Sequence, residues 1–513
     1  MKSLHLDARS TNMSGDVDHP STLRGSASDN AAVLLRACVL IPAVMLVVSG
    51  VLFAAQMMFA HMGQQDVPWS VTYFKSNIHA AYHAFKLAEA DSWDPMWRAR
   101  LWLATNPGKD VYEALFFQVG VKFQYPVSSL LFLEWLPLDA RDPIRILNAL
   151  NLGIFLLLVV GMVLLMLTLV DRARAAGAQI DRRNRSLLAA LAAIATVCFY
   201  PALWSLQGGQ IQMLLNVWFV FACRSYVRGG STTAGILMGL STLIKPQMAP
   251  FLVWGLLRRD MRFTTGWAAS VVVGLVASAV AYGPTWPIGY LHVLSFIGSH
   301  GESYYLNQSV NGLLNRLLEN GTNLNWCPGW IPPKIFPPQG PIVEATAVRW
   351  PQLHWQGSPF PPYHPIVHAG TLAATGIFTV AGLACGLHRW SAGRPGWSLA
   401  VAGLCFTMAS PVAWTHHYGV LLPAFAFCLV SLLSGGRESN LRGRSAWVML
   451  AVTYLIAANS WSMTNWVIRG PFSLLQSYVF FAAIATLGLM WTLCKPLVRT
   501  PAAEATKGCF RAA

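Results

Sequence analysis

The sequence contains few charged residues. Only 11% of its 513 residues are Asp, Glu, Lys or Arg, and 55% are hydrophobic, whereas about a quarter of a soluble protein is charged. The apolar residues collect in runs of roughly twenty, the length that crosses a hydrocarbon core about 30 Å thick. This composition excludes an ordinary soluble fold and predicts an all-α polytopic membrane protein.

Carboxylates are absent from the predicted spans. Of the 21 Asp and Glu residues, nine fall in 61–143, three in 286–365 and the others in segments on the opposite side. Proton-coupled pumps and cation transporters usually place a carboxylate within their helices, near the bilayer midplane. The sequence also has no Walker-type phosphate loop. Both ion-coupled and ATP-driven transport by this chain are therefore disfavoured.

The sequence has no apolar stretch near Met1, where a cleaved signal peptide would need one. We expect residues 1–31 and 495–513 to be cytosolic tails, the first of them disordered, because its polar composition cannot bury a core. The nine cysteines lie mostly in or next to apolar runs, so no disulfide framework is expected. The formal net charge of +15 is spread over short loops, which argues against a nucleic-acid partner.

The apolar runs predict roughly twelve crossings in one membrane domain, 32–494. They lie at about 37–60, 144–170, 186–205, 211–227, 231–244, 247–257, 264–285, 366–388, 396–411, 415–434, 446–463 and 474–494. Two of them, 231–244 and 247–257, are too short to cross comfortably and flank Lys245. A lysine at membrane depth is tolerated only beside a cavity or a polar partner, so Lys245 is a candidate functional residue.

Arginines mark one side of the predicted membrane domain. They are Arg172, Arg174, Arg182, Arg183, Arg185, Arg224, Arg228, Arg258, Arg259, Arg262, Arg389, Arg394, Arg437, Arg442 and Arg444. The positive-inside bias places these loops and both termini in the cytosol, with the domain in the plasma membrane. The long segments 61–143 and 286–365 then face the outside, where we expect the chemistry.

The first outer segment contains a histidine pair with the spacing of metal ligands. His79 and His83 are one helical turn apart, as metal ligands on a helix often are. No acidic third ligand lies nearby, and the neighbouring pattern is typical of a helix lying on the membrane surface. No metal site and no cofactor are therefore predicted.

Five short motifs follow one another along the chain. They are Lys122-Phe123-Gln124-Tyr125-Pro126 with Ser128-Ser129-Leu130-Leu131, then Gly209-Gln210-Ile211-Gln212, Ile244-Lys245-Pro246-Gln247, Asn307-Gln308-Ser309 with Asn311-Gly312 and Arg316, and Ser410-Pro411-Val412-Ala413-Trp414-Thr415-His416-His417. In order and in position they resemble the motifs of glycosyltransferase family 87, a GT-C-type group that includes bacterial polyprenyl-phosphate mannosyltransferases. The resemblance covers about residues 60–430.

This resemblance implies a GT-C-type fold and an activity. A hexose, with mannose the first expectation, would move from a polyprenyl-phosphate donor to a glycolipid or glycan acceptor at the outer face, with inversion. Such a transfer needs a base for the acceptor hydroxyl and positive charge or hydrogen bonds on the departing phosphate. The predicted substrate-binding residues are Tyr125, Gln210, Lys245, Gln247, Asn307, Gln308, Arg316, Trp414, His416 and His417.

Within this set the side-chain chemistry suggests a division of roles. Lys245, Arg316 and one of the two adjacent histidines would hold the lipid phosphate, because cations form strong hydrogen bonds with it. The amides of Gln210, Asn307 and Gln308 suit sugar hydroxyls, because an amide both donates and accepts.

The sequence departs from the family's pattern at three places. Val127 stands where the family usually has a second proline, and Gln212 where it usually has asparagine. The resemblance also implies a catalytic Asp just outside the first helix, and Phe74-Lys75-Ser76-Asn77 lacks it. Asp66 is the best replacement for this base, and Glu113 is the second choice.

Other interpretations stay open at this stage. Asp66 can equally be a solvated loop acid, and Lys245 a lysine that snorkels from a short helix to the interface. An O-antigen ligase or polymerase would use a diphosphate-linked glycan and more clustered arginines in the outer loops. A lipid or solute transporter would move its substrate without changing it covalently.

Overall fold

The computed structural model describes residues 21–61, 76–318, 360–361, 363–387, 396–434, 441–467 and 471–494. Within these ranges the chain is helices and connecting loops, and the extended pairing is a single bridge between Asn307 and Trp414. The predicted all-α fold is confirmed. The predicted base Asp66 and the predicted C-terminal tail lie outside the described residues, whereas the first helix already begins at Ser21.

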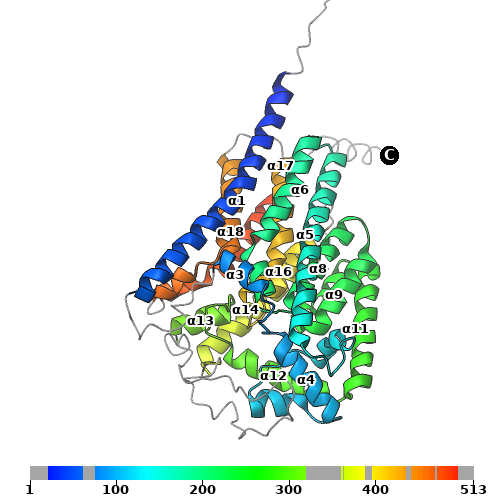
Figure 1. Cartoon of the computed structure of the whole chain (residues 1–513). Helices are drawn as coiled ribbons and strands as arrows, with labels where there is room; N and C mark the ends of the chain where they lie inside the picture. Colours follow the sequence, from blue (N-terminus) through cyan, green and yellow to red (C-terminus); the bar gives the residue numbers. More distant parts are fainter. Residues whose placement is uncertain are drawn as a thin grey trace, which may run out of the picture.

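Figure 1 shows a bundle of long helices with shorter helices gathered at one end. The first half comprises α1 (Ser21–His61), α3 (Asn77–Ala84), α4 (Trp93–Thr105), η1 (Tyr112–Val119), η2 (Val127–Leu133), α5 (Pro143–Ala175), α6 (Arg182–Val197), α7 (Tyr200–Gln207), α8 (Gln212–Val227) and α9 (Ser231–Ile244). The second half comprises η3 (Pro246–Met248), α10 (Phe251–Leu257), α11 (Met261–Tyr282), α12 (Trp286–His300), α13 (Val310–Leu318), α14 (Pro365–Ala384), α16 (Trp397–Met408), η5 (Thr415–Val420), α17 (Leu421–Ser434), α18 (Leu441–Ala458), η6 (Ser462–Val467), η7 (Pro471–Ser477) and α19 (Tyr478–Cys494).

Six helical segments of the described chain are long and apolar enough to cross a membrane. They are Ala31–Ala55, Pro143–Ala175, Met261–Tyr282, Pro365–Ala384, Thr415–Ser434 and Phe472–Cys494. The pair α6 and α7, bent by 48°, makes a seventh if it counts as one span. The chain is therefore a multi-pass membrane protein, and the number twelve stays a prediction because α9, α16 and α18 are shorter apolar helices.

The break between α9 and α10 follows from one proline. Pro246 disfavours helical geometry in the residue before it, and Lys245 accordingly has φ −133° and ψ 99°. The helix therefore ends at Ile244, as the short run 231–244 predicted. Lys245 is left in an extended backbone at the end of an apolar helix.

Close packing fixes the helix that carries Lys245. At Gly239 of α9, an added Cβ would lie 2.6 Å from the carbonyl oxygen of Trp267 on α11. Small residues at such a contact let two helix backbones approach closely, which stabilises helix pairs in membranes. The end of α9 therefore has a defined position relative to α11.

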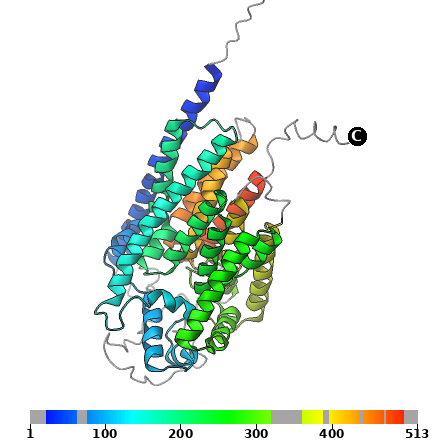
Figure 2. The ribbon, with the colours of Figure 1, turned by 90° about the vertical axis from the view of Figure 1, so that its right-hand side faces the viewer.

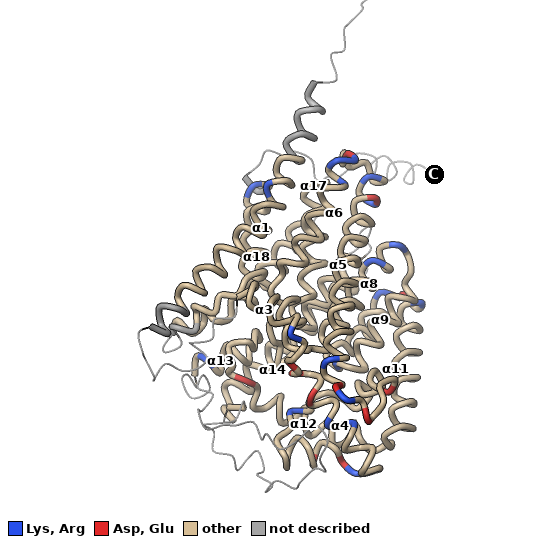
Figure 3. Tube along the Cα trace, viewed as in Figure 1, with Lys and Arg blue, Asp and Glu red and all other residues tan. Residues whose placement is uncertain are grey.

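The two ends of the bundle differ in composition. Figure 3 shows acidic positions gathered around α4 and α12, and basic positions at the far ends of α5 and α6. Figure 2 shows the start of α1 and the end of α19 towards that same far end. Among the described residues, the bundle thus presents one end built from 76–143 and 286–318 and another with short arginine-bearing turns.

Candidate active site

The loop before α4 is held against the turn between α7 and α8. Asp91 N donates a hydrogen bond to Gly208 O at 2.9 Å, and Ser92 N donates to Gly209 O at 3.2 Å. Gly209 has φ +60°, and a side chain there would collide with the carbonyl of Glu89. Glycine is the residue that tolerates both this conformation and this approach, so the Gly-Gln motif receives the Asp91 loop.

Two asparagines of α5 support the same junction. Asn148 Nδ2 donates to Glu89 O at 2.7 Å, and Asn151 Nδ2 donates to Gln210 O at 3.1 Å. Both asparagines are buried. Buried amides that satisfy loop carbonyls restrict the loop to one conformation. The backbone on both sides of the contact is therefore fixed from the long helix.

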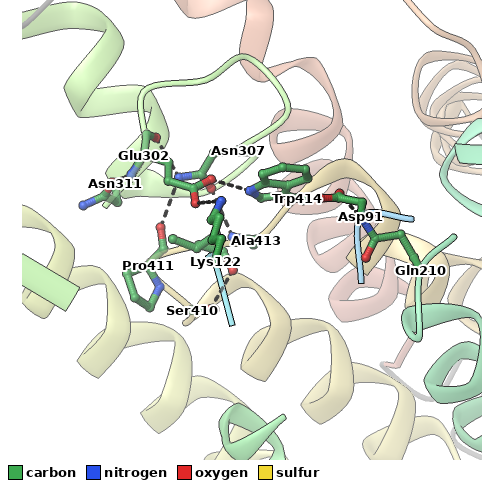
Figure 4. A network of polar contacts seen from close by, with 11 residues as sticks. Asp91, Lys122, Gln210, Glu302, Asn307, Asn311, Ser410, Pro411, Ala413 and Trp414 are labelled. Carbon is green, nitrogen blue, oxygen red and sulfur yellow. Dashed lines mark hydrogen bonds and ion pairs between the residues drawn. The ribbon is translucent and has the colours of Figure 1, made fainter. Parts of the chain in front are cut away.

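A chain of hydrogen bonds runs from Tyr125 to Asp91. Ser92 Oγ donates to Gln210 Oε1 at 2.5 Å and lies 2.8 Å from Tyr125 Oη. Because a serine has one hydroxyl proton, Tyr125 is the donor to Ser92. Gln210 Nε2 in turn donates to Asp91 Oδ2, the contact drawn at the right of Figure 4. The first two motifs thus orient one carboxylate.

Asp91 is accessible, although the groups that orient it are not. Asp91 is exposed, whereas Gln210 is 2% exposed and Ser92 is fully buried. An exposed carboxylate that a buried amide orients can accept a proton from a bound hydroxyl. General bases require this combination of orientation and access.

Lys245 lies deep in the same region. Its side chain is buried, its Nζ contacts His417 Nε2, and Asp91 lies within electrostatic range of it. The end of α9 is tied to the first motif, because Ser128 Oγ donates to Leu243 O at 2.5 Å. The structure therefore brings the predicted cation to the oriented carboxylate.

A second carboxylate is fully committed to other groups. Glu302, in the loop between α12 and α13, is buried and forms an ion pair with Lys122 Nζ. Its other oxygen accepts a hydrogen bond from Trp414 Nε1, as Figure 4 shows. The Lys122 ammonium also lies 4.7 Å from the Trp414 ring centroid. Glu302 and Lys122 therefore neutralise each other, whereas the Asp91 carboxylate belongs to an exposed residue.

The pKa values of two tyrosines are affected by both carboxylates. Burial raises the pKa of Tyr125, and Asp91 and Glu302 raise it further, against the lowering effect of Ser92. Burial likewise raises the pKa of Tyr304 to about 12, and the same two carboxylates contribute. Both phenols are therefore neutral donors near pH 7, and the two carboxylates flank one polar region.

The amides of Asn307 and Gln308 are used by the protein itself. Gln308 Nε2 donates to Tyr305 O at 2.6 Å and to Gln476 O at 2.7 Å, and its Oε1 accepts from Val479 N and Phe480 N. Both amide protons and both acceptor positions of this side chain are thus occupied. We conclude that Gln308 holds the loop rather than offering groups to a sugar.

Asn307 is used in the same way. Its Nδ2 donates to Glu302 O at 2.8 Å and to Pro411 O at 3.2 Å, and its Oδ1 accepts from Ala413 N at 3.0 Å. Asn307 also forms the backbone bridge with Trp414. The fourth motif therefore joins the fifth and positions Glu302 and Trp414.

Arg316 supports this loop from α13. Its guanidinium donates to the carbonyls of Tyr304 and Asn307, each at 3.0 Å, and to Ser477 Oγ at 2.5 Å. The residue is 1% exposed. Burial lowers its pKa to about 9, which still leaves it charged near neutral pH. The geometry supports a role in holding the loop of Glu302. Arg316 Nε is buried without a hydrogen-bond partner in the described structure, and contact with a phosphate stays a prediction.

The two histidines of the fifth motif retain spare polar atoms. His416 and His417 are 2% and 7% exposed, and the Nδ1 atom of each is buried without a hydrogen-bond partner in the described structure. If Lys245 donates to His417 Nε2, then His417 Nδ1 carries the proton and can donate it elsewhere. Both lysines of the region lie within electrostatic range of His416. Such buried unsatisfied groups are common where a ligand binds.

Two other predicted residues lie at the margin of this arrangement. Glu113 is half-buried on η1, where its Oε1 accepts a hydrogen bond from Gln118 Nε2 at 3.3 Å. Gln247 is half-buried in η3, two residues beyond Lys245. Neither is placed in the hydrogen-bonded chain that ends at Asp91. Their predicted roles stay predictions.

Comparison with known proteins adds the family. The model of glycosyltransferase family 87 matches residues 123–411, more than half of the chain. The chain belongs to glycosyltransferase family 87. It is also 25% identical over 354 residues to the polyprenol-phosphate-mannose-dependent alpha-(1-2)-phosphatidylinositol mannoside mannosyltransferase of Mycobacterium tuberculosis, an alignment that covers 67% of this chain and 70% of that protein. With its spanning helices, this family 87 chain is a membrane glycosyltransferase.

The sequence did not single out three residues of this candidate site. Asp91 is one of nine acids in its segment, and its selection depends on Gln210, which is distant in sequence. Lys122 stood inside a quoted motif without a role. Glu302 carried a usable signal, because it is one of three acids in 286–365.

Proposed function

We propose that this glycosyltransferase transfers a hexose from a polyprenyl-phosphate donor to a hydroxyl of a glycolipid acceptor, with Asp91 as the base. One observation carries the proposal: an accessible carboxylate, oriented by buried Gln210, lies within electrostatic range of buried Lys245. A carboxylate and a cation are the two groups that such a transfer needs. Asp66 and Glu113 remain rival bases for the same step.

The reaction is a displacement at the anomeric carbon. Asp91 accepts the proton of the acceptor hydroxyl as its oxygen bonds to that carbon, and the bond from the carbon to the phosphate oxygen breaks with inversion. The electron pair leaves on the polyprenyl phosphate. Lys245 and the spare Nδ1 proton of His417 stabilise the departing anion, an effect that is strong where water is excluded.

The finer assignments rest on likeness and charge distribution. Mannose and a phosphatidylinositol-type glycolipid acceptor are suggested by the name of the mycobacterial relative. Arginine-bearing turns at the end of the bundle opposite the site support cytosolic termini and a reaction on the outer face of the plasma membrane. Trp414, Tyr125 and Gln247 would contact the donor sugar.

The test measures release of polyprenyl phosphate by purified protein. Radiolabelled polyprenyl-phosphate mannose is supplied with a membrane-lipid extract as acceptor, and wild type is compared with Asp91→Asn, Asp66→Asn and Glu113→Gln. We expect Asp91→Asn to lower turnover by roughly 10²- to 10⁴-fold, the usual contribution of a positioned base. Glu134→Gln is a suitable control, because Glu134 is an exposed acid of the same segment bonded to Arg100.

The result also separates the rival interpretations. Loss in Glu113→Gln or Asp66→Asn alone would keep the reaction and move the base. An active wild type that accepts only diphosphate-linked glycans would favour a ligase or polymerase. Movement of the intact donor lipid across liposomes without release of polyprenyl phosphate would make the chain a transporter.

A further inference from the structure

A polar cavity lies among the ends of α5, α6 and α8. Its volume is about 450 Å³. Four arginines line it, Arg172, Arg185, Arg224 and Arg228, together with one carboxylate, Asp171. Figure 3 shows basic positions gathered at these helix ends. The cavity therefore combines enough space for a small headgroup with an excess of positive charge.

Internal contacts neutralise only part of this charge. Arg185 forms two hydrogen bonds with Asp171, at 3.0 and 3.2 Å. Arg224 and Arg228 are one turn apart on α8 and close enough to repel each other. Like charges at this spacing destabilise a helix. Arg224 Nε is also buried with no hydrogen-bond partner in the described structure.

The helix dipoles do not remove the excess of positive charge in the cavity. The C-termini of α5 and α8 each contribute about half a negative charge, and the N-terminus of α6 adds about half a positive one. Four arginines and one aspartate therefore leave between two and three positive charges without a counterpart. A positive-inside bias explains arginines near this end, but not a buried guanidinium nitrogen of Arg224 without a hydrogen-bond partner in the described structure.

The wall of the cavity is apolar on one side. Leu164 and Leu167 of α5 line it beside the arginines, and both are half-buried. A free phosphate has no apolar part that could contact such a surface. An amphiphile with an anionic head and acyl chains matches both halves of the lining, and basic pockets between membrane helices bind such headgroups.

We propose that this cavity binds the phosphate headgroup of an anionic phospholipid, with Arg224 and Arg228 as the principal donors. Guanidinium groups bind phosphate oxygens in bidentate fashion. A bound phosphate would satisfy Arg224 Nε and relieve the repulsion between the two arginines. Leu164 and Leu167 would contact the first part of the acyl chains.

This lipid site is separate from the reaction site. Asn148, which supports the Asp91 loop, and Arg172 are 24 positions apart on α5, which corresponds to about 36 Å of helix. That separation is several times the screening length of about 8 Å at physiological salt. Occupancy of the cavity is thus measurable without turnover of a donor.

The experiment is a titration of the thermal unfolding of the purified full-length chain in detergent. The probes are dioctanoyl phosphatidylglycerol, dioctanoyl phosphatidylcholine and inorganic phosphate, all at matched ionic strength. Arg224→Gln with Arg228→Gln removes the proposed donors. Arg182→Gln with Arg183→Gln is the matched control, since it removes two exposed charges at the same end of the bundle. Leu167→Trp fills the cavity and leaves all the arginines in place.

We expect saturable stabilisation of the wild type by phosphatidylglycerol and none by phosphatidylcholine. Binding should weaken at least about tenfold in Arg224→Gln/Arg228→Gln, since each charge-assisted hydrogen bond is worth roughly that factor. It should also weaken in Leu167→Trp and persist in the control pair. Equal weakening in both double variants would reduce the site to non-specific attraction and overturn the proposal. Equal stabilisation by inorganic phosphate would overturn the lipid assignment.

Discussion

Gln210 Nε2 donates a hydrogen bond to Asp91 Oδ2 across 119 residues of sequence. The amide cannot turn over, because its oxygen accepts the proton of Ser92. Oδ2 of Asp91 is therefore engaged, while the residue itself remains accessible. A carboxylate in this position is pre-organised, so that little ordering is left to the moment of reaction.

Replacing this amide with an acid should change the pH dependence of the enzyme. In Gln210→Glu, two carboxylates would share one hydrogen-bonding position, which raises one of their pKa values. A base with a raised pKa becomes protonated at a higher pH, so the acidic limb of the rate profile should move to higher pH. The measurement is turnover against pH for wild type and variant.

The matched control for this change is Gln118→Glu. Gln118 donates to Glu113 as Gln210 donates to Asp91. If Glu113 were the base, Gln118→Glu would shift the profile and Gln210→Glu would leave it in place. The two candidate bases are therefore separated by which of the two variants shifts its pH profile, without removing either carboxylate.

Removing the buried ammonium should weaken the donor. Lys245→Met keeps an unbranched chain in an apolar setting and deletes the charge that we propose for the departing phosphate. A charge-assisted hydrogen bond is worth about 1.5–3 kcal/mol, so donor affinity should fall roughly 10- to 150-fold. The check is binding of a non-hydrolysable polyprenyl-phosphate sugar. Lys109→Met, at an exposed lysine of the first long segment, should leave affinity unchanged.

The sequence predicted elements better than contacts. Pro246 fixes the end of α9, so the position of Lys245 could be derived from local chemistry. The choice of Asp91 could not, because nothing near it in sequence separates it from Glu89 or Asp94. Its proposed role depends on contacts between the loop before α4 and the turn at Gly209, which are distant in sequence. Local rules are silent on such long-range contacts.

The predicted roles of Gln308 and Arg316 show a second limit of prediction from the sequence. Gln308 and Arg316 have side chains suited to sugars and phosphates, and the motif pattern placed them near the reaction. In the fold they bind carbonyls and hydroxyls of their own chain instead. Side-chain type indicates what a residue can bind, and only packing decides whether that partner is a ligand or the backbone.

Arg316 gives a test of this distinction. Arg316→Met would leave the carbonyls of Tyr304 and Asn307 without their donor, at a cost of about 2–4 kcal/mol in unfolding free energy. Arg98→Met, which breaks the partly exposed ion pair with Asp94, should cost less than about 1 kcal/mol. Thermal unfolding in detergent measures both. An Arg316→Met variant with wild-type stability and weakened donor binding would instead support the prediction that Arg316 binds the lipid phosphate.

The turn at Gly209 should be intolerant of any side chain. Gly209→Ala must pay for a left-handed φ, about 1–2 kcal/mol, and must also displace Glu89 or Asn148. Gly108→Ala separates the two effects, since Gly108 has φ +76° with nothing within 4 Å of an added Cβ. We expect Gly108→Ala to lower stability modestly and leave turnover intact. Gly209→Ala should lower turnover by at least about tenfold, because a shift of the Asp91 loop near 1 Å misplaces the base. Equal turnover in the two variants would contradict the claim that the Gly-Gln motif positions the Asp91 loop for catalysis.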